Sequence, residues 1–475
     1  DRQLRRAMAV LVPSLLVALY GGYRIKLSRD LSHRVEAHLR DGQKLRAQAQ
    51  KLNADVEDLR KKAFAAFDSQ KKEEGEKLWA RVLELSQELD ELLGRAGQAV
   101  EGAVTLDGSR VDARQQLAEV LYQRALGAER DHMAAKQRDL LARMELYDTT
   151  GALGQKWNQA ARVQIQTVPA GATVRLGRYE ENKRHRFLLV EDRAIGTSPV
   201  SPIELHQGSY LLVFSAPGRA EIHYPFIVTR GEQLALNVEL PPAESVPAGF
   251  VYVPPGRFLF GTAEADAIRQ SFLQTTPIHS RETPGYLIAK YETILGQWIE
   301  FLSSLPPKER TKYSIEFTNA GASGGIGLAQ LPDGAWQLTL QAVGTTYTLR
   351  QGQPLIYGGR TRNKQLDWSK LPASGMDRDS AEAYTAWLRS SGRLPGARLC
   401  SELEWERAAR GADAREHPQG NLIDGQEANI DESYGRDNMG PDEVGLYPAS
   451  QSPFGIHDMA GNVNEWVRSA DRKST

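Results

Sequence analysis

The sequence predicts a multidomain protein with an N-terminal transmembrane helix and helical stalk, a small antiparallel β domain, and a C-terminal α+β domain. Three observations lead to this fold class: an uncharged apolar run near the start, a long charged stretch with helical periodicity, and short β-rich runs separated by proline and glycine. Since period 3.6 indicates helices and period 2 indicates strands, the expected regions are a transmembrane helix at 7–23, a helical stalk or bundle at 27–160, the β domain at 163–241 and the last domain at 250–475.

Composition limits the classes of function. At 475 residues the chain has room for two or three domains. Its formal net charge of −1 gives no overall field that would attract nucleic acid, so no nucleic-acid partner is expected. A single cysteine, Cys400, excludes a disulfide framework or a multi-cysteine metal site within these residues. Because the first residue is Asp1 rather than methionine, we expect both ends to be boundaries within a longer protein.

The run AMAVLVPSLLVALYGGY, residues 7–23, is the predicted membrane anchor. About 17 helical residues span roughly 26 Å, at the short end for a bilayer crossing. A signal peptide would also place basic residues before an apolar core, but no small-x-small cleavage site follows, and basic residues flank both sides. A buried soluble helix would show polar positions at helical spacing, and this run has none. The nearly balanced flanking charges specify the orientation only weakly.

Residues 27–160 carry three runs with apolar residues at three- and four-residue steps, which indicates amphipathic helices. The second run, GEKLWARVLELSQELDELLGRAG, is expected to end at Gly97, and the third to be capped by Asp107 or Ser109. We interpret the apolar positions as core and the alternating charges as a solvated face. A stalk of this kind can also self-associate.

Between Val163 and Pro241 the period changes to that of strands, in runs such as VQIQTVPAGATVRLGRY and IHYPFIV. The turn motifs TVPAGATV, IGTSP and HQGSYLL resemble those of the PEGA domain, a small β module. The resemblance implies a module that binds or spaces other parts outside the membrane.

The C-terminal region mixes strands and helices. GYLIAKYETILGQWIEFLSSLP predicts a strand followed by a helix that buries Trp298 and Phe301. DRDSAEAYTAWLRSSG predicts a second helix that begins near Asp379 or Ser380. RLCSELEWERAARG predicts a third with a capping box, because Glu404 follows Ser401 by three residues.

Four motifs of this region, VPPGRFLFG, AYTAWL, RLCSELEWERAARG and GNVNEW, resemble the formylglycine-generating enzyme (sulfatase-modifying factor) family over residues 250 to about 467. The resemblance implies an irregular, loop-rich α+β fold related to C-type lectins. Two departures are visible: Cys400 and Ser401 stand where Pro and Thr are usual, and Asn464 replaces the usual Trp.

The family oxidises a substrate cysteine to formylglycine with oxygen, using a copper-binding cysteine pair, since thiolates suit soft Cu(I). In the family this pair lies downstream of the G-N-x-x-E-W motif, and the present sequence has no cysteine after Cys400. The resemblance therefore implies copper only where such a pair follows in a longer protein, and no catalytic residue is expected here. Cys400 is interpreted as a buried small residue.

The resemblance also implies two calcium sites built from side-chain and main-chain oxygens, which is the ligand set that hard Ca²⁺ prefers. A Gly-Asn turn with a helix-capping acid would explain the same residues without metal. The second site would use Asp458, the backbone of Gly461 and Val463, and Glu465. The first would use Asn429, the backbone of Ile430, Asp437 and the carbonyl of Met439.

Three functions from different classes remain open: a membrane-anchored extracytoplasmic binding or sensory module, a formylglycine-generating oxidase, and a structural envelope protein. Bacterial transmembrane Ser/Thr kinases carry the same order of parts after a cytoplasmic catalytic domain, so the resemblance implies such an upstream half. No H-R-D, D-F-G or V-A-I-K motif occurs in these residues. We favour the first function, with the bulk of the chain in the periplasm or at the cell surface, and with the membrane and an extracytoplasmic protein or glycan ligand as partners.

Overall fold

The computed structural model describes residues 2–317, 324–342 and 344–468, with side chains from residue 15 onward except 17 and 436. The chain forms two compact units, Asp1–Gln159 and Ala160–Thr475. The predicted multidomain organisation is therefore confirmed at this coarse level: a helical N-terminal region precedes small sheets and an α+β region.

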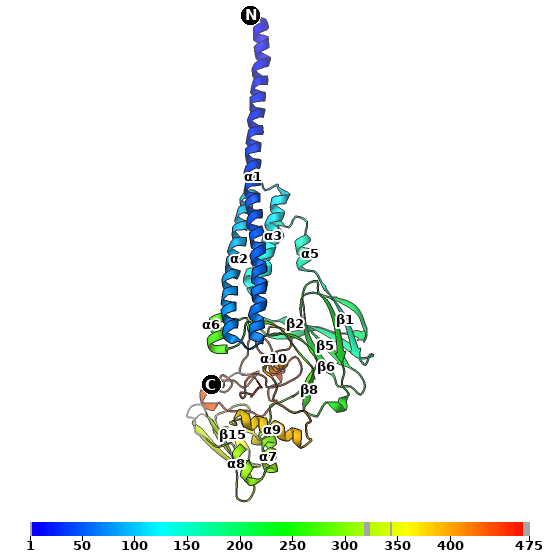
Figure 1. The fold of residues 1–475 in the computed structure, drawn as a ribbon, viewed down its shortest axis with the longest axis vertical. Coiled ribbons are helices and arrows are strands. Elements are labelled where there is room, and N and C mark those ends of the chain that lie inside the picture. Colours follow the sequence, from blue (N-terminus) through cyan, green and yellow to red (C-terminus); the bar gives the residue numbers. More distant parts are fainter. Residues whose placement is uncertain (1, 318–323, 343, 469–475) are drawn as a thin grey trace. The chain divides into compact units, whose positions relative to one another are not determined.

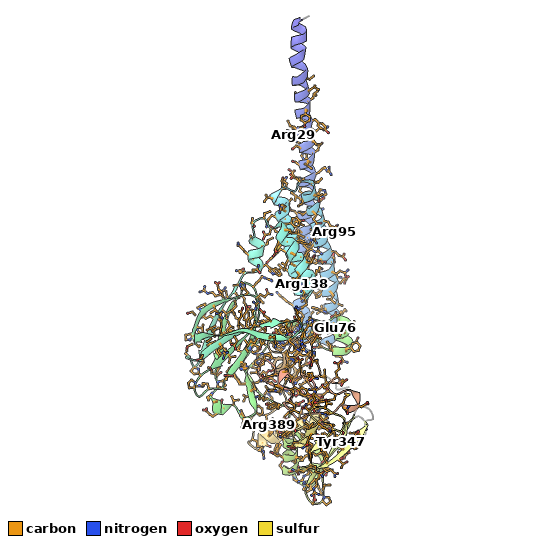
Figure 2. The ribbon with its side chains drawn as sticks, turned by 180° about the vertical axis from the view of Figure 1, so that it is seen from behind. Arg29, Glu76, Arg95, Arg138, Tyr347 and Arg389 are labelled. Carbon is orange, nitrogen blue, oxygen red and sulfur yellow. The ribbon has the colours of Figure 1, made fainter. Side chains whose placement is uncertain are left out.

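The first unit is an antiparallel helical hairpin followed by shorter helices (Figure 1). Its elements are α1 (Arg2–Asp68), α2 (Lys72–Leu106), α3 (Val111–Arg130), α4 (Ala134–Tyr147) and α5 (Ala152–Trp157). Charged side chains such as Arg95 and Arg138 are exposed on the outer faces of the helices (Figure 2).

The seam of the hairpin follows a seven-residue repeat, as expected for two helices that coil around each other. The buried α1 positions at this spacing are Val35, Gly42, Ala49, Val56 and Ala63. A Cβ atom at Gly42 would lie 2.5 Å from Val100 Cγ2, so the two helices approach closely at this glycine.

Two predicted helix boundaries are wrong. The second helix does not end at Gly97 but continues to Leu106, because Gly97 is buried in the helical core, where a Cβ would meet Val120 at 3.7 Å. The third helix is not capped by Asp107 or Ser109. Asp107 instead accepts hydrogen bonds from the Ser109 backbone and hydroxyl in the preceding turn.

The predicted membrane segment, residues 7–23, falls largely on positions whose side chains are outside the described set. Over the described residues, no helix contains a stretch both long and apolar enough to cross a bilayer.

The second unit begins with seven strands in two small sheets, ordered β4-β1-β7 and β3-β2-β5-β6. The strands are β1 (Ala161–Val168), β2 (Thr173–Glu181), β3 (Phe187–Thr197), β4 (Val200–Leu205), β5 (Gly208–Ser215), β6 (Ile222–Val228) and β7 (Gln233–Glu239). Alternate side chains from both sheets form one hydrophobic core, in which Val163, Leu212 and Phe214 are fully buried.

The expectation of a purely antiparallel β domain is wrong for one pair of strands. β1 and β7 pair in parallel, from Arg162 opposite Gln233 to Val168 opposite Glu239. These are the first and last strands of the domain, and the five strands between them supply the long crossover that parallel pairing requires.

The rest of the unit is an irregular α+β domain. Its strands are β8 (Phe250–Val253), β9 (Gly256–Phe260), β10 (His279–Thr283), β11 (Tyr286–Ala289), β12 (Gly325–Gln330), β13 (Trp336–Ala342), β14 (Thr345–Arg350), β15 (Leu355–Ile356) and β16 (Gln365–Leu366). Its helices are α6 (Asp266–Ile268), η2 (Arg269–Leu273), α7 (Leu295–Ser304), α8 (Pro307–Tyr313), η4 (Trp368–Lys370), α9 (Arg378–Ser390), α10 (Glu402–Arg410), η5 (Arg436–Asn438) and η6 (Pro448–Ser450).

The helices of this domain behave largely as the sequence predicts. Trp298 and Phe301 of α7 are buried in the main core. The capping box of α10 is confirmed, with Ser401 Oγ accepting from the Glu404 backbone and Glu404 accepting from the Ser401 backbone. α9 begins at Arg378, next to the predicted Asp379, and its N-cap is Asp377.

The β2–β3 turn of the β domain packs against loop 413–427 of the α+β domain. Arg186 forms an ion pair of 2.5 Å with Glu427. In the same loop Arg415 is almost fully buried and forms an ion pair of 2.7 Å with Asp413. The two domains of this unit are therefore joined by a partly buried ion pair as well as by the chain.

Candidate ligand-binding groove and its acidic loop

Loop 456–466, which contains the GNVNEW motif, is organised around Asn462. Its backbone has φ +63°, a conformation that asparagine tolerates better than most residues. The backbone N–H donates to the Asn429 carbonyl at 2.7 Å, and the side-chain amide donates to Glu292 Oε2 at 2.9 Å. Asn462 Oδ1 accepts from the Asp442 N–H at 2.9 Å. One residue thus joins three segments that are distant in sequence.

The predicted second calcium set lies within this loop. Asp458 is buried, and its Oδ2 accepts from the Gly445 N–H at 2.5 Å. Glu465 accepts a hydrogen bond from the Trp405 indole. Gly461 lies between them with φ +89°, and a Cβ there would be 2.4 Å from the Asn429 carbonyl oxygen.

The carboxylates of Asp458, Glu465 and Glu292 lie together at this loop, and no cation among the described residues neutralises them. Burial, reinforced by the neighbouring Asp442 charge, raises the pKa of Asp458 to about 6. Burial together with Asp458 raises the pKa of Glu465 to about 6, although solvent reaches this carboxylate through the groove. Burial and the charges of Glu465 and Asp458 raise the pKa of Glu292 well above its ordinary value. Like charges in a weakly hydrated place disfavour ionisation.

The predicted first set is spread over two neighbouring turns. Asn429 Nδ2 donates to the Gly440 carbonyl at 2.9 Å, so its segment lies against the residue that follows Met439. The Ile430 carbonyl accepts from a backbone N–H at 2.9 Å. Asp437 is exposed on η5.

A fully buried arginine holds the turn that contains Met439. Arg360 donates to the carbonyls of Asn438 at 2.8 Å and Gly440 at 2.7 Å, and pairs with Asp442 Oδ1 at 2.6 Å. The Arg360 guanidinium lies 3.6 Å from the centroid of the Tyr357 ring. Loop 429–442 therefore has an internal cation, in contrast to loop 456–466.

The donor sets differ in how well they fit calcium. In the described part of the chain, no group of three or more His, Cys, Asp and Glu residues has metal-binding geometry. The predicted sets rely on main-chain oxygens instead. Asp458 and Glu465 supply carboxylate oxygens whose charge no described cation compensates, so the second set fits a hard cation. The first set offers only the exposed Asp437, beside a turn already held by Arg360.

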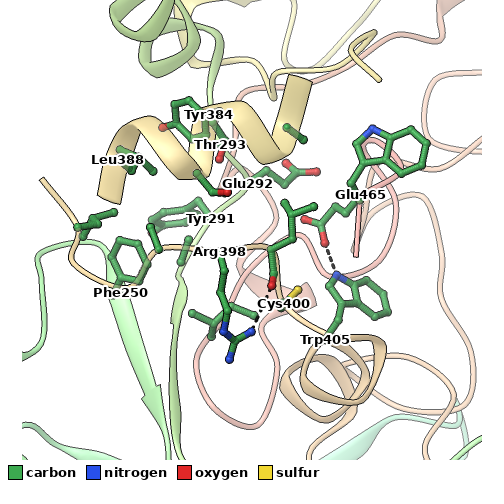
Figure 3. Close-up of a pocket in the computed structure, with 18 of the residues that line it drawn as sticks. Phe250, Tyr291, Glu292, Thr293, Tyr384, Leu388, Arg398, Cys400, Trp405 and Glu465 are labelled. Atoms are coloured by element: carbon green, nitrogen blue, oxygen red, sulfur yellow. Dashed lines mark hydrogen bonds between the residues drawn. The ribbon is translucent and has the colours of Figure 1, made fainter. Parts of the chain in front are cut away.

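A cavity of about 1180 Å³ opens beside the acidic loop. Its walls come from β11, α9, residues 394–400 and the acidic loop itself, and Figure 3 shows Glu292 and Glu465 reaching into it from different segments. Its charged lining residues are Glu292, Glu465 and the Arg398–Glu404 pair, whose closest atoms are 2.6 Å apart. The remaining lining is mainly aromatic and aliphatic, so the cavity is an apolar groove with an acidic end.

Cys400 also lines the groove, but it does not suit copper. Burial, with Glu465 and Glu404 nearby, raises the pKa of its thiol to about 12. Cu(I) sites need thiolates, and this is the one cysteine in the sequence. The residues present therefore do not fit the copper centre.

Sequence reasoning missed Glu292 and Arg360. Glu292 lies between a strand and a helix in IAKYETILG, three residues before the helix begins at Leu295, and an acid near a helix start is a pattern of ordinary helix capping. Arg360 lies 82 residues from its partner Asp442, so no local pattern connects the two.

The fold and the groove define an α+β domain with an apolar groove that ends at an acidic loop. A sequence model of the sulfatase-modifying factor enzyme 1-like domain matches residues 238–475, half of the chain. The chain therefore belongs to this family.

Proteins with different activities are similar to this chain in sequence. The chain is 24% identical over 360 residues to serine/threonine-protein kinase Pkn1 of Chlamydia trachomatis, covering 74% of this chain and 47% of the relative. It is 27% identical over 201 residues to hercynine oxygenase of Mycobacterium tuberculosis, covering 41% and 40%. It is 25% identical over 244 residues to formylglycine-generating enzyme of Thermomonospora curvata, covering 47% and 72%. The chain spans about half the length of the first two relatives.

Proposed function

We propose that this chain is the membrane-anchored, extracytoplasmic part of a transmembrane Ser/Thr protein kinase, and that its C-terminal domain is a ligand-binding sensory module. The observation that carries the proposal is the apolar groove with an acidic end, in a family domain whose residues here do not fit the copper centre. Similarity to the kinase Pkn1 over 74% of the chain supports the kinase context.

The membrane anchor is the apolar run at 7–23. In its described part, α1 exposes large apolar side chains, including Leu16, Leu19 and Tyr20, which are 60–65% exposed. A helix that exposes such residues needs a partner, because an isolated helix has little stability of its own in water. A bilayer is the partner we propose, and self-association of the stalk would be compatible with it.

The intermediate regions take spacing and binding roles in this proposal. The β domain is PEGA-like, as its turn motifs suggest, and the C-terminal domain is related to C-type lectins. Calcium is proposed at Asp458 and Glu465 with main-chain oxygens of Gly461 and Val463, because these carboxylates fit a hard cation. The first set, at Asn429, Ile430, Asp437 and Met439, is the weaker candidate.

Topology reporters at the C-terminus of the full chain test the proposal in a Gram-negative host. Alkaline phosphatase becomes active only when it is exported from the cytoplasm. Green fluorescent protein fluoresces when it stays in the cytoplasm but not when the general secretory pathway exports it. We expect active phosphatase and no fluorescence. Deleting residues 7–23 should release the chain from the membrane fraction. A fluorescent fusion with inactive phosphatase would refute an extracytoplasmic module.

A second candidate function is a formylglycine-generating oxidase, which similarity to the Thermomonospora curvata enzyme favours. It requires a cysteine pair beyond these residues. The present chain, given Cu(I), oxygen, a reductant and a cysteine peptide from a sulfatase, should leave the peptide mass unchanged. Conversion of the cysteine to formylglycine would show that these residues suffice, and would overturn the sensory assignment.

A further inference from the structure

The β domain and the α+β domain meet where β6 contacts β8 and β9 (Figure 1). Ile227 of β6 packs against a small hydrophobic cluster that includes Phe258 and Ala412. A Cβ atom at Gly411, which ends α10, would lie 3.4 Å from Pro225 Cβ of β6. The C-terminal half of α10 therefore lies at the junction of the two domains.

One arginine of α10 differs from the other buried arginines. In the described part of the chain, four arginine side chains are buried: Arg269, Arg360, Arg407 and Arg415. Arg269, Arg360 and Arg415 each form an ion pair with an aspartate, at 3.0, 2.6 and 2.7 Å respectively. Arg407 is 1% exposed, and no described carboxylate forms an ion pair with it. The described residues therefore leave the charge of Arg407 uncompensated.

The unpaired side of the Arg407 guanidinium is its Nε–Nη2 edge. Nη1 donates to the Thr283 hydroxyl, whereas Nε is buried and donates to no described residue. The same edge of Arg415 donates to both carboxylate oxygens of Asp413, each at 2.7 Å. This edge of a guanidinium presents two parallel N–H groups, which suits an anion. Arg407 thus presents the edge that Arg415 uses for its aspartate.

A tyrosine hydroxyl of the β domain lies beside this edge. A Cβ atom at Gly256 would be 2.6 Å from Arg407 Nη2 and 3.0 Å from Tyr224 Oη, so both atoms approach the same glycine. Burial raises the pKa of Tyr224 above its ordinary value, so the hydroxyl stays protonated. Glu282 is exposed, and its charge is the weakest of the neighbouring influences on the pKa of Arg407. Tyr224 can therefore donate a hydrogen bond to an anion but cannot replace one.

The buried guanidinium of Arg407 needs a counter-charge. Arginine stays protonated even where burial lowers its pKa, because its ordinary pKa lies far above neutrality. An uncompensated buried charge is strongly destabilising, so an anion taken from solution would stabilise the folded chain. Because Arg407 is almost completely enclosed, that anion must be small, and a single negative charge suffices. A chloride-sized ion meets both conditions, whereas a phosphate ester or a peptide carboxylate does not.

We propose that a chloride-sized monovalent anion binds the Nε–Nη2 edge of Arg407 and accepts a hydrogen bond from the Tyr224 hydroxyl. Because Arg407 belongs to the α+β domain and Tyr224 to the β domain, the ion joins the two domains. Arg407 is not part of the groove lining, so this site is separate from the groove. The inference does not depend on the proposed location or sensory role of the chain.

Thermal unfolding of the full chain in detergent, followed by tryptophan fluorescence, tests the site. The protein is dialysed into sodium gluconate, whose anion is too large for an enclosed site. Chloride then replaces gluconate stepwise at constant ionic strength. The midpoint of the wild type should rise and then saturate, because a ligand that binds only the folded state stabilises it. Bromide, which has the same charge and a similar size, should act in the same way.

Two variants and a matched control locate the ion. Arg407→Met removes the charge but keeps a long side chain. Its midpoint should not respond to chloride, and in gluconate should be at least as high as that of the wild type. Tyr224→Phe should raise the half-saturating chloride concentration about three- to tenfold, through the loss of one hydrogen bond. The control is Tyr210→Phe, which removes a hydrogen bond of 2.7 Å to the His206 carbonyl and should lower the midpoint equally at every chloride concentration.

The linewidth of the chloride NMR signal gives a readout that is independent of stability. The native wild type should broaden the signal more than Arg407→Met or Tyr224→Phe does. Equal wild-type midpoints in chloride and gluconate, a chloride effect that persists in Arg407→Met, or an Arg407→Met midpoint lowered equally in both salts would overturn the proposal. If Arg407→Met does not fold, an unchanged half-saturating concentration and linewidth in Tyr224→Phe would overturn it.

Discussion

Loops 429–442 and 456–466 each bury one aspartate in the interior of the same domain, Asp442 and Asp458, but the described residues give an internal cation only to the first. In loop 429–442, the fully buried Asp442 pairs with the equally buried Arg360 at 2.6 Å and also accepts from the Tyr447 hydroxyl at 2.6 Å. In loop 456–466, Asp458 and Glu465 face each other's charge and that of Glu292.

The difference explains which loop needs an ion from outside. A buried carboxylate is stable only when its charge is compensated and its oxygens are hydrogen-bonded. Arg360 supplies both in the first loop and also holds the carbonyls on each side of Met439. The second loop lacks such a group in the described structure, so a bound cation has more to stabilise there.

The largest effect is expected from Arg360→Met. Removing the guanidinium leaves Asp442 buried without its charge partner, which costs about 3–5 kcal/mol of the free energy of unfolding. Denaturant unfolding of the full chain, followed by tryptophan fluorescence, measures it. The control is Arg378→Met, whose pair with Glu382 is exposed and should contribute under about 1 kcal/mol. Equal losses in both variants would show that Arg360 does not neutralise the loop.

The reactivity of the Cys400 thiol reports on the surroundings of loop 456–466, where the acidic charge is not compensated. Because the pKa of its thiol is raised to about 12, only a very small fraction is thiolate at pH 8. Alkylation by iodoacetamide should therefore be at least about a hundredfold slower than for a free thiol, and should accelerate with rising pH beyond 10. Denatured protein is the matched control, since unfolding removes the burial. A native rate close to the denatured rate would mean that the thiol is not in a weakly hydrated place.

The Asn462→Ala substitution should remove the hydrogen bonds that link the two loops. The substitution removes hydrogen bonds to Glu292 and to the Asp442 backbone and places alanine at φ +63°. We expect a loss of about 2–4 kcal/mol in unfolding free energy, from unpaired buried groups and backbone strain. Asn464→Ala, two residues along and exposed, should change it by less than about 0.5 kcal/mol. Similar losses for both would argue against Asn462 as the joint.

Local patterns account for the parts of the fold that could be predicted. The helical period of residues 27–160 and the capping box at Ser401 and Glu404 involve neighbours in sequence, and both appear in the structure. The GNVNEW motif likewise located the acidic loop. Pairings over long separations were not predictable: Glu292 lies 170 residues from Asn462, and the parallel pairing of β1 with β7 depends on the whole β domain between them.

In the stalk, local sequence patterns likewise did not predict the role of a glycine. A glycine is a common helix terminator, so Gly97 was expected to end the second helix. Its actual role depends on α3, which packs Val120 against it. No pattern within one helix contains that information.

Calcium titration of the chelator-treated full chain by isothermal calorimetry tests the contrast between the two loops most directly. The expected result is one bound Ca²⁺ per chain, lost in Glu465→Gln and retained in Asp437→Asn, with a rise in melting temperature on binding. Absence of binding, or binding that Asp437→Asn abolishes and Glu465→Gln leaves intact, would contradict the view that only loop 456–466 depends on an external cation.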